Sequence, residues 1–179
     1  MKVLVTGGSG IVGHYVINEL LEYNHEVVNA DKIRWGSMGH SGTTITANAE
    51  TALKMRESWG NLPTFYEVDV TNYGQVISAM EGCDAVIHLA CISNDPSFEL
   101  NPDLGRSINL TPFEPLVKMS KDEGVRHFLY ASSSSVYGDA RIVPTNENYG
   151  PLYPISHYGA SKLACEAMVS SFCHNYNIE

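Results

Sequence analysis

Short apolar runs alternate along the chain with longer segments in which apolar residues recur at helical spacing. The apolar runs predict strands at residues 2–6, 26–31, 64–68, 85–90 and 126–132. The helical spacing predicts helices at residues 11–23, 49–59 and 73–80, within 111–123, and at about 156–175. Apolar strands that alternate with helices are typical of a parallel sheet covered on both faces. The pattern therefore predicts a doubly wound α/β fold.

The spacing also predicts which side of two helices is buried. In the first helix the predicted apolar stripe comprises Val12, Val16, Leu20 and Tyr23. In the last helix the predicted buried side comprises Ala160, Leu163, Ala164, Ala167, Met168 and Phe172. Residues 35–48 break the alternation with glycine and small polar residues, and they predict either a surface loop or a lid over a bound nucleotide.

Composition and charge narrow the classes of function. The 179 residues are 44% hydrophobic and 17% charged, which is typical of one globular domain. The formal net charge of −9 disfavours binding to a nucleic acid. It leaves a phosphate-bearing small ligand open, because backbone N–H groups bind phosphate without Lys or Arg.

Apolar stretches and cysteines bear on location and on metals. The longest apolar stretch, residues 85–92, is shorter than a membrane helix needs, and the N-terminus lacks a signal-peptide core. We therefore expect a cytoplasmic protein that does not bind membranes. The four cysteines form no CxxC pair, so they predict free thiols rather than a disulfide framework, and we expect no metal site.

A glycine-rich turn joins the first predicted strand to the first helix, with the sequence TGGSGIVG. Gly7 would permit the tight turn, Gly10 the approach of a pyrophosphate, and Gly13 close packing of the helix on the sheet. The start of the helix, at Ile11 and Val12, offers N–H donors to a diphosphate. This context predicts a Rossmann-type doubly wound sheet, in three α/β/α layers, that binds a dinucleotide.

Charged residues at the ends of the second and third strands bear on the choice of cofactor. Asp31 would accept hydrogen bonds from the adenosine ribose hydroxyls and repel the 2′-phosphate of NADP, so NAD is favoured. Lys32 and Arg34 could each pair with that phosphate, which keeps NADP open. Asp69 and Val70 lie at the same sheet edge, in the cofactor site or in a helix N-cap region.

Two polar motifs follow the fifth strand, SSSSVYG at residues 132–138 and YGASK at residues 158–162. Tyr158 and Lys162 are four residues apart, so they share a helix face. A nearby ammonium would favour the tyrosine phenolate and lower its pKa. Such a tyrosine could take a proton from an alcohol while hydride leaves the same carbon for nicotinamide. A serine hydroxyl from the strand end would hold the substrate oxygen.

Taken together, these motifs resemble the extended short-chain dehydrogenase/reductase family, the NAD-dependent nucleotide-sugar epimerases and dehydratases. The resemblance also includes the segment HLA at residues 88–90. It implies Ser133 as the active-site serine, Tyr158 as the general base, and Lys162 as its partner. The expected cofactor-binding residues are Gly7, Gly10, Ile11, Val12, Gly13, Asp31, Lys32, Asp69, Val70, Leu89, Ala90, Tyr158 and Lys162.

The resemblance also bears on the reaction. In the dehydratases and decarboxylating members an acidic residue commonly follows the active-site serine within two positions, whereas this chain has Ser134 and Ser135 and so lacks a carboxyl there. We therefore expect a nucleotide-sugar epimerase, similar to the UDP-glucose/UDP-galactose 4-epimerases. A dehydrogenase, reductase or dehydratase of the same family stays open. The sugar also stays open, because Ser93 stands where those 4-epimerases carry lysine.

Family members continue into a sixth strand and a substrate-binding part, whereas this sequence stops at Glu179. We therefore expect residues 1–179 to form an NAD(P)-binding domain that is truncated before that strand. A cofactor-binding module without turnover is a further alternative. An uncovered sheet edge favours association, and we expect a homodimer.

Overall fold

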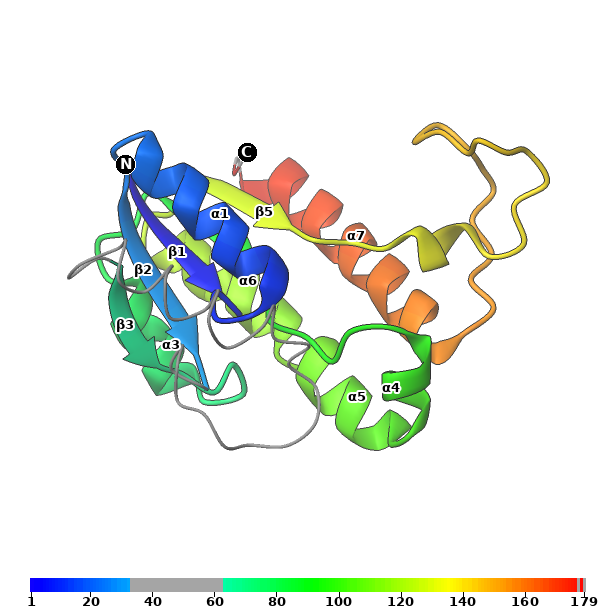
Figure 1. Ribbon diagram of the computed structural model, residues 1–179, viewed down its shortest axis with the longest axis horizontal. Coiled ribbons are helices and arrows are strands. Elements are labelled where there is room, and N and C mark those ends of the chain that lie inside the picture. The colour runs from blue at the N-terminus through cyan, green and yellow to red at the C-terminus, as the bar shows by residue number, and fades with distance from the viewer. Residues whose placement is uncertain (33–62, 177, 179) are drawn as a thin grey trace.

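The computed structural model describes residues 1–32, 63–176 and 178, and a parallel sheet runs through them (Figure 1). Its strands are β1 (Lys2–Thr6), β2 (Glu26–Asp31), β3 (Thr64–Glu67), β4 (Ala85–His88) and β5 (His127–Tyr130). They lie in the order β3-β2-β1-β4-β5, and each neighbouring pair is parallel. The strand order reverses at β1, between β2 and β4, and ligands bind outside the carboxyl ends of the strands at such a point.

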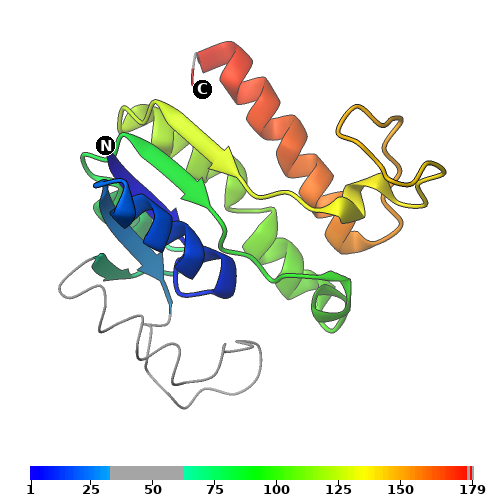
Figure 2. The same ribbon diagram turned by 45° about the horizontal axis from the view of Figure 1, so that its top comes forward.

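Helices cover both faces of this sheet (Figure 2). On one face α1 (Ile11–Glu22) packs on Val3, Val5 and Val27 through Ile17. The opposite face is covered by α3 (Tyr73–Met80), α6 (Phe113–Asp122) and α7 (His157–Tyr176). The predicted three-layer, doubly wound α/β/α fold is therefore confirmed.

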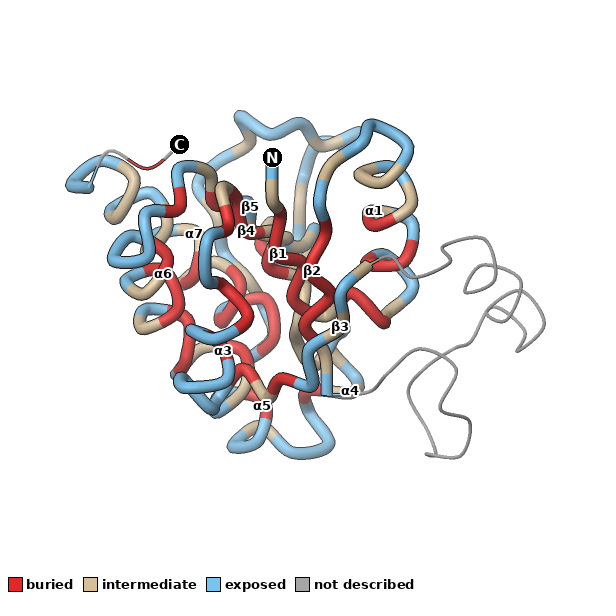
Figure 3. Tube along the Cα trace, turned by 90° about the vertical axis from the view of Figure 1, so that its left-hand side faces the viewer, coloured by how far each residue is buried: buried red, intermediate tan, exposed pale blue. Residues whose placement is uncertain are grey.

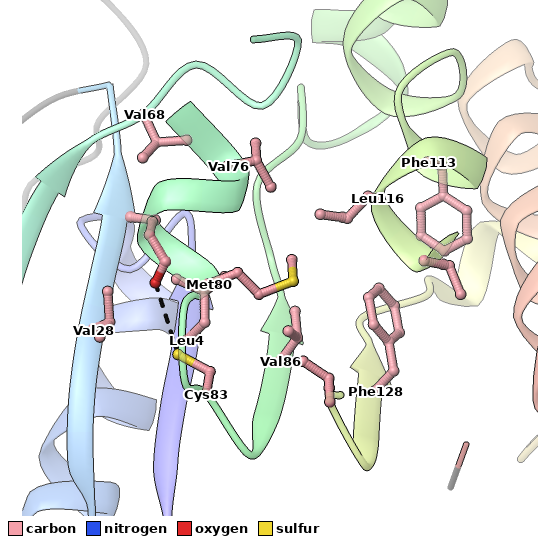
Figure 4. Close-up of a cluster of buried hydrophobic side chains, with 14 of the residues drawn as sticks. Leu4, Val28, Val68, Val76, Met80, Cys83, Val86, Phe113, Leu116 and Phe128 are labelled. Atoms are coloured by element: carbon pink, nitrogen blue, oxygen red, sulfur yellow. Dashed lines mark hydrogen bonds between the residues drawn. The ribbon is translucent and has the colours of Figure 1, made fainter. Parts of the chain in front are cut away.

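The larger hydrophobic core lies between the sheet and the helices α3, α6 and α7. Figure 4 shows the end of Met80 of α3 close to Val86 of β4, with Leu116 of α6 pointing into the same cluster. Successive strand residues point to opposite faces, so Leu4 enters this core while Val3 and Val5 enter the other. The central strands are buried on both sides (Figure 3), which explains their continuous apolar runs.

The predicted elements are present within the described residues, with shorter strands and additional short helices. β3, β4 and β5 end one or two residues before their predicted ends, at Glu67, His88 and Tyr130. Two further helices, α4 (Asp95–Glu99) and α5 (Pro102–Asn109), were not predicted. The predicted loop at 35–48, the predicted helix at 49–59 and Arg34 lie outside the described residues.

The predicted apolar stripe of the first helix is wrong at Val12 and Tyr23, whereas Val16 and Leu20 are partly buried and pack against the core. Val12 is 62% exposed and Tyr23 74% exposed, whereas Gly13, His14 and Ile17 are buried. Gly13 has no side chain, so this side of the helix approaches the glycine turn closely. A Cβ added there would lie 2.5 Å from the carbonyl oxygen of Gly7. Close backbone packing, rather than the largest apolar stripe, sets the orientation of α1.

The predicted buried side of the last helix is wrong for Ala160 and Ala167, which are exposed. Leu163, Ala164, Met168 and Phe172 are partly buried. The fully buried positions are Tyr158, Gly159, Ser161, Lys162 and Cys165. Most of them are polar, and burial is tolerated because they have partners: Ser161 Oγ donates to the Tyr158 carbonyl at 2.7 Å.

Candidate active site

The glycine turn fits tightly against the segment that follows β4. Gly7 has a φ of +72°, and a Cβ added there would lie 2.7 Å from the backbone nitrogen of Ala90. The N–H of Leu89 donates to the carbonyl of Thr6 at 3.0 Å. Leu89 and Ala90 therefore lie beside the turn, at the joint carboxyl end of β1 and β4.

The start of α1 is open to a ligand. Gly10 is its N-cap residue, and no side chain among the described residues caps the helix. Within the same residues, a Cβ added at Gly10 would meet only the Gly7 carbonyl, at 3.3 Å. Ile11 and Val12 at the first turn are exposed. Uncapped N–H donors beside open space fit a diphosphate, so the chain has a cradle suited to a dinucleotide.

The charged residues at the ends of β2 and β3 form two separate pairs. Asp31 Oδ2 accepts a hydrogen bond from the Ser9 N–H at 3.0 Å, which ties the strand end to the glycine turn. Lys32 Nζ lies 2.8 Å from Asp69 Oδ2. This contact, followed by hydrogen bonds from Thr71, lowers the pKa of Asp69 to about 2. The Lys32 ammonium, which could have bound the 2′-phosphate of NADP, is therefore paired with Asp69.

Asp69 lies close to a helix start without being its cap. It accepts hydrogen bonds from the N–H and hydroxyl of Thr71, at 2.9 and 2.7 Å. Asn72 is the N-cap residue of α3, and its side chain accepts from the Gln75 N–H at 3.3 Å. Val70 is buried under this turn.

The three predicted catalytic residues lie together beyond the carboxyl end of β5. Ser133 precedes the short helix η1 (Ser134–Tyr137), and it makes a side-chain hydrogen bond to the Tyr158 phenol. The side chain of Lys162 is buried, and its Nζ donates to the Ala131 carbonyl at 2.9 Å. The same Nζ lies 5.7 Å from the centre of the Tyr158 ring.

The pKa of Tyr158 is raised in this structure, so the expected net lowering is wrong. Burial raises that pKa, and Cys91 adds to the increase. Hydrogen bonds from Ser133 and from the backbone of Asn94 act in the opposite direction. Lys162 faces the ring and is fixed on the Ala131 carbonyl, so its charge is held beside the phenol without dominating its ionisation.

His88, at the end of β4, lies between Thr6 of β1 and Tyr130 of β5 and has a structural role. Its Nδ1 lies 2.7 Å from Thr6 Oγ1, and its ring stacks on Tyr130 at 6.2 Å between centres. Burial and then the charge of Lys162 lower the pKa of His88 to about 3. The imidazole is therefore neutral at neutral pH and holds neighbouring strand ends together.

Two residues at the start of α4 belong to this site, although sequence reasoning did not single them out. Asp95 Oδ2 accepts a hydrogen bond from the Ser135 hydroxyl at 3.0 Å. Asn94 has a φ of +66° and caps α4 by accepting from the Ser97 N–H. The sequence has no carboxyl at the two positions after Ser133, but the folded chain brings the Asp95 carboxylate from a distant segment to Ser135. The inference that this site lacks a carboxyl is therefore wrong. The pattern Asn-Asp-Pro, a helix-start signal, could have identified Asp95.

The fold and these motifs agree with a comparison against protein families. A model of the NAD dependent epimerase/dehydratase family matches residues 3–179. The chain belongs to this family. Its members are NAD-dependent enzymes, which agrees with the dinucleotide cradle at the glycine turn.

Several individual relatives are UDP-glucose 4-epimerases. A UDP-glucose 4-epimerase of Drosophila melanogaster is 29% identical over 173 residues, and one of Homo sapiens is 30% identical over 174. Each match covers 96% of this chain but only 48% and 49% of the relative. The chain thus spans about half the length of the curated relatives it matches.

Solved structures of the same kind have the same fold. A Thermus thermophilus UDP-glucose 4-epimerase in complex with NAD superposes with a TM-score of 0.80 at 26% identity, covering 100% of this chain and 53% of that one. A Thermotoga maritima UDP-glucose 4-epimerase with UDP-glucose gives 0.80 at 25% identity, covering 99% and 53%.

The described residues contain neither a membrane-spanning helix nor a metal-binding cluster. In the part of the chain that the structure describes, no helix is both long and apolar enough to span a bilayer. The same described residues hold no group of three His, Cys, Asp or Glu side chains arranged for a metal ion.

Proposed function

We propose that residues 1–179 form the NAD(P)-binding domain of a nucleotide-sugar 4-epimerase, with Tyr158 as the base. The observation that carries the proposal is the meeting of Ser133, Tyr158 and Lys162 beyond β5, beside the dinucleotide cradle of β1 and β4. Membership of the family and the 4-epimerase relatives support it.

In this proposal the cofactor is held mainly by backbone. The N–H groups of Ile11 and Val12 bind the diphosphate, and Asp31 binds the ribose hydroxyls. NAD bound there would supply the hydride acceptor for a sugar carbon, and return of the hydride to the opposite face of that carbon would give the epimer. Because Lys32 is paired with Asp69, NAD is preferred over NADP.

The chain's own side chains handle the proton. Tyr158 takes the proton of the sugar hydroxyl at the carbon that loses hydride, and gives it back when hydride returns. Ser133 Oγ accepts from the Ser135 N–H at 3.2 Å, so its own hydrogen is available for the phenol or for the substrate oxygen. Lys162 holds a positive charge beside the ring and favours the phenolate once it forms.

Cofactor binding is tested by thermal unfolding of this chain with NAD and with NADP. Saturation at about 100 times Kd would stabilise the chain by roughly 2.7 kcal/mol, with the larger shift for NAD. Tyr158→Phe should keep the shift, because the backbone cradle proposed to hold the diphosphate is unchanged. If neither cofactor raises the melting temperature, the proposal fails at its first step.

Turnover is tested on a panel of UDP- and dTDP-sugars. Formation of the 4-epimer is expected, and Tyr158→Phe should abolish it. Tyr153→Phe is the matched control, because it makes the same change at a tyrosine that is 71% exposed. Undiminished turnover in Tyr158→Phe would refute the role of the phenol.

Two other outcomes correspond to other functions. NAD binding without turnover of any sugar would indicate a cofactor-binding module. A keto-sugar that has lost water would indicate a dehydratase, which the carboxylate of Asp95 beside Ser135 favours.

Assembly and location complete the proposal. We propose a cytoplasmic homodimer with a nucleotide-sugar substrate. Leu129 on the outer strand β5 is 51% exposed and supports association along that edge. Light scattering on the purified chain should give the mass of a dimer, and a monomer mass at all concentrations would contradict it.

A further inference from the structure

Asp95 is connected to the Tyr158 phenol by a short series of hydrogen bonds. The Ser135 hydroxyl donates to Asp95 Oδ2 at 3.0 Å. The Ser135 N–H donates to Ser133 Oγ at 3.2 Å, and the Ser133 side chain hydrogen-bonds the phenol. Ser135 thus binds the Asp95 carboxylate through its side chain, and it binds the Ser133 hydroxyl through its backbone N–H.

This arrangement bears on what the Ser133 hydroxyl can donate to. A serine hydroxyl has one hydrogen to donate and lone pairs that accept. Because Ser133 Oγ accepts from the Ser135 N–H, its own hydrogen is left to donate, and the phenol oxygen of Tyr158 is an acceptor for it. This hydrogen bonding depends on the position of η1, which Asp95 holds from a separate element, α4.

We propose that Asp95 is a positioning residue of the proton-transfer site. It binds Ser135 and so fixes the turn that holds the Ser133 hydroxyl next to the Tyr158 phenol. The proposal rests on the role of Tyr158 proposed above. It concerns a residue that does not itself touch the reacting atoms.

The carboxylate also acts on the phenol through its charge. Among the described residues, four groups with charge or titratable protons face Tyr158: Asp95 from α4, Cys91 from the segment after β4, Tyr130 from β5, and Lys162 from its own helix. Asp95 and Cys91 raise the pKa of Tyr158, and the hydrogen bond from Ser133 lowers it. Asp95 therefore has two opposite effects, one by charge and one by anchoring.

Two variants separate these effects. Asp95→Asn removes the charge and keeps an oxygen that accepts from Ser135, so the ionisation midpoint of Tyr158 should move to lower pH by several tenths of a unit. Ser135→Ala keeps the charge and removes the anchor, so the midpoint should move to higher pH. Ser135→Thr keeps a hydroxyl and should restore the wild-type midpoint.

The midpoint is measured from tyrosinate absorbance after rapid jumps to alkaline pH, read before the chain unfolds. Each protein is compared with its own Tyr158→Phe counterpart, which subtracts the other tyrosines. Asp103→Asn is the charge control, because Asp103 lies on α5, is 92% exposed and pairs with Arg106. Far-ultraviolet circular dichroism confirms that each variant is folded.

Opposite shifts in Asp95→Asn and Ser135→Ala, with no shift in Asp103→Asn, would support the proposal. An unchanged midpoint in Asp95→Asn, shifts in the same direction, or an equal shift in Asp103→Asn would overturn it. None of these results depends on turnover. Failure of the proposed epimerase activity and failure of the proposed role of Asp95 can therefore be distinguished.

Discussion

Gly13 offers a direct test of the glycine turn, because a side chain there would collide with backbone. A Cβ added at Gly13 would lie 2.5 Å from the Gly7 carbonyl oxygen and 2.5 Å from Gly8 Cα. Backbone atoms of a tight turn cannot rotate away as the end of a side chain can. We therefore predict that Gly13→Ala shifts α1 away from the turn and weakens NAD binding together with stability.

The size of the effect follows from two opposing contributions. Overpacking of one methyl group costs about 1–3 kcal/mol, whereas alanine in place of glycine in a helix gains roughly 0.5–1 kcal/mol. The collision is with fixed atoms, so the cost dominates. For a domain of this size, a net loss of about 1–2 kcal/mol lowers the melting temperature by about 2–8 °C.

Thermal unfolding with and without NAD measures both consequences. Gly74→Ala is the matched control, because a Cβ at Gly74 would meet only Asn72 Oδ1, at 3.5 Å, among the described residues. This control should keep or slightly raise the melting temperature and leave the NAD shift intact. The packing argument would be refuted if the Gly13→Ala protein had the melting temperature of the wild type and the same shift of that temperature with NAD.

Two further predictions concern stability away from the glycine turn. Asp69→Asn should lose at most about 1 kcal/mol in urea unfolding at neutral pH, because its ion pair with Lys32 is half-exposed. The pKa of Asp69 is lowered to about 2, so this stabilisation is present above its ordinary pKa of 3.8. The difference from wild type should therefore vanish as pH falls from about 4 through about 2, and a constant difference would contradict the ion pair. Phe113→Ala removes a ring that is 1% exposed and contacts Phe128, so it should cost about 3–5 kcal/mol in urea unfolding. A loss below about 1 kcal/mol would show that Phe113 is not a core residue.

The order of elements could be predicted because each one carries its own local signal. Apolar runs of four to six residues identified every described strand, from β1 (Lys2–Thr6) to β5 (His127–Tyr130). α4 and α5 could not be recognised by periodicity, because Asp95–Glu99 and Pro102–Asn109 are too short and polar to show an apolar stripe. Their caps, Asn94 and Asn101, were the available signal.

The orientation of helices was less predictable than their positions. In α7 the largest apolar stripe did not match the buried side, because Ser161 and Lys162 are buried with polar partners. In α1 the absence of a side chain at Gly13 decided the contact with the turn. Burial depends on which surface fits the neighbour, and that surface is formed by other segments.

By itself the sequence determined the strand–helix alternation, the glycine turn after β1, and the spacing of Tyr158 and Lys162, because these depend on residues close together in the chain. Only the tertiary structure decided that Asp95 meets Ser135 and that Lys162 binds the Ala131 carbonyl. It also decided that burial, not the ammonium, dominates the pKa of Tyr158. Desolvation and contacts between distant segments arise only when the chain has folded, so no local pattern records them.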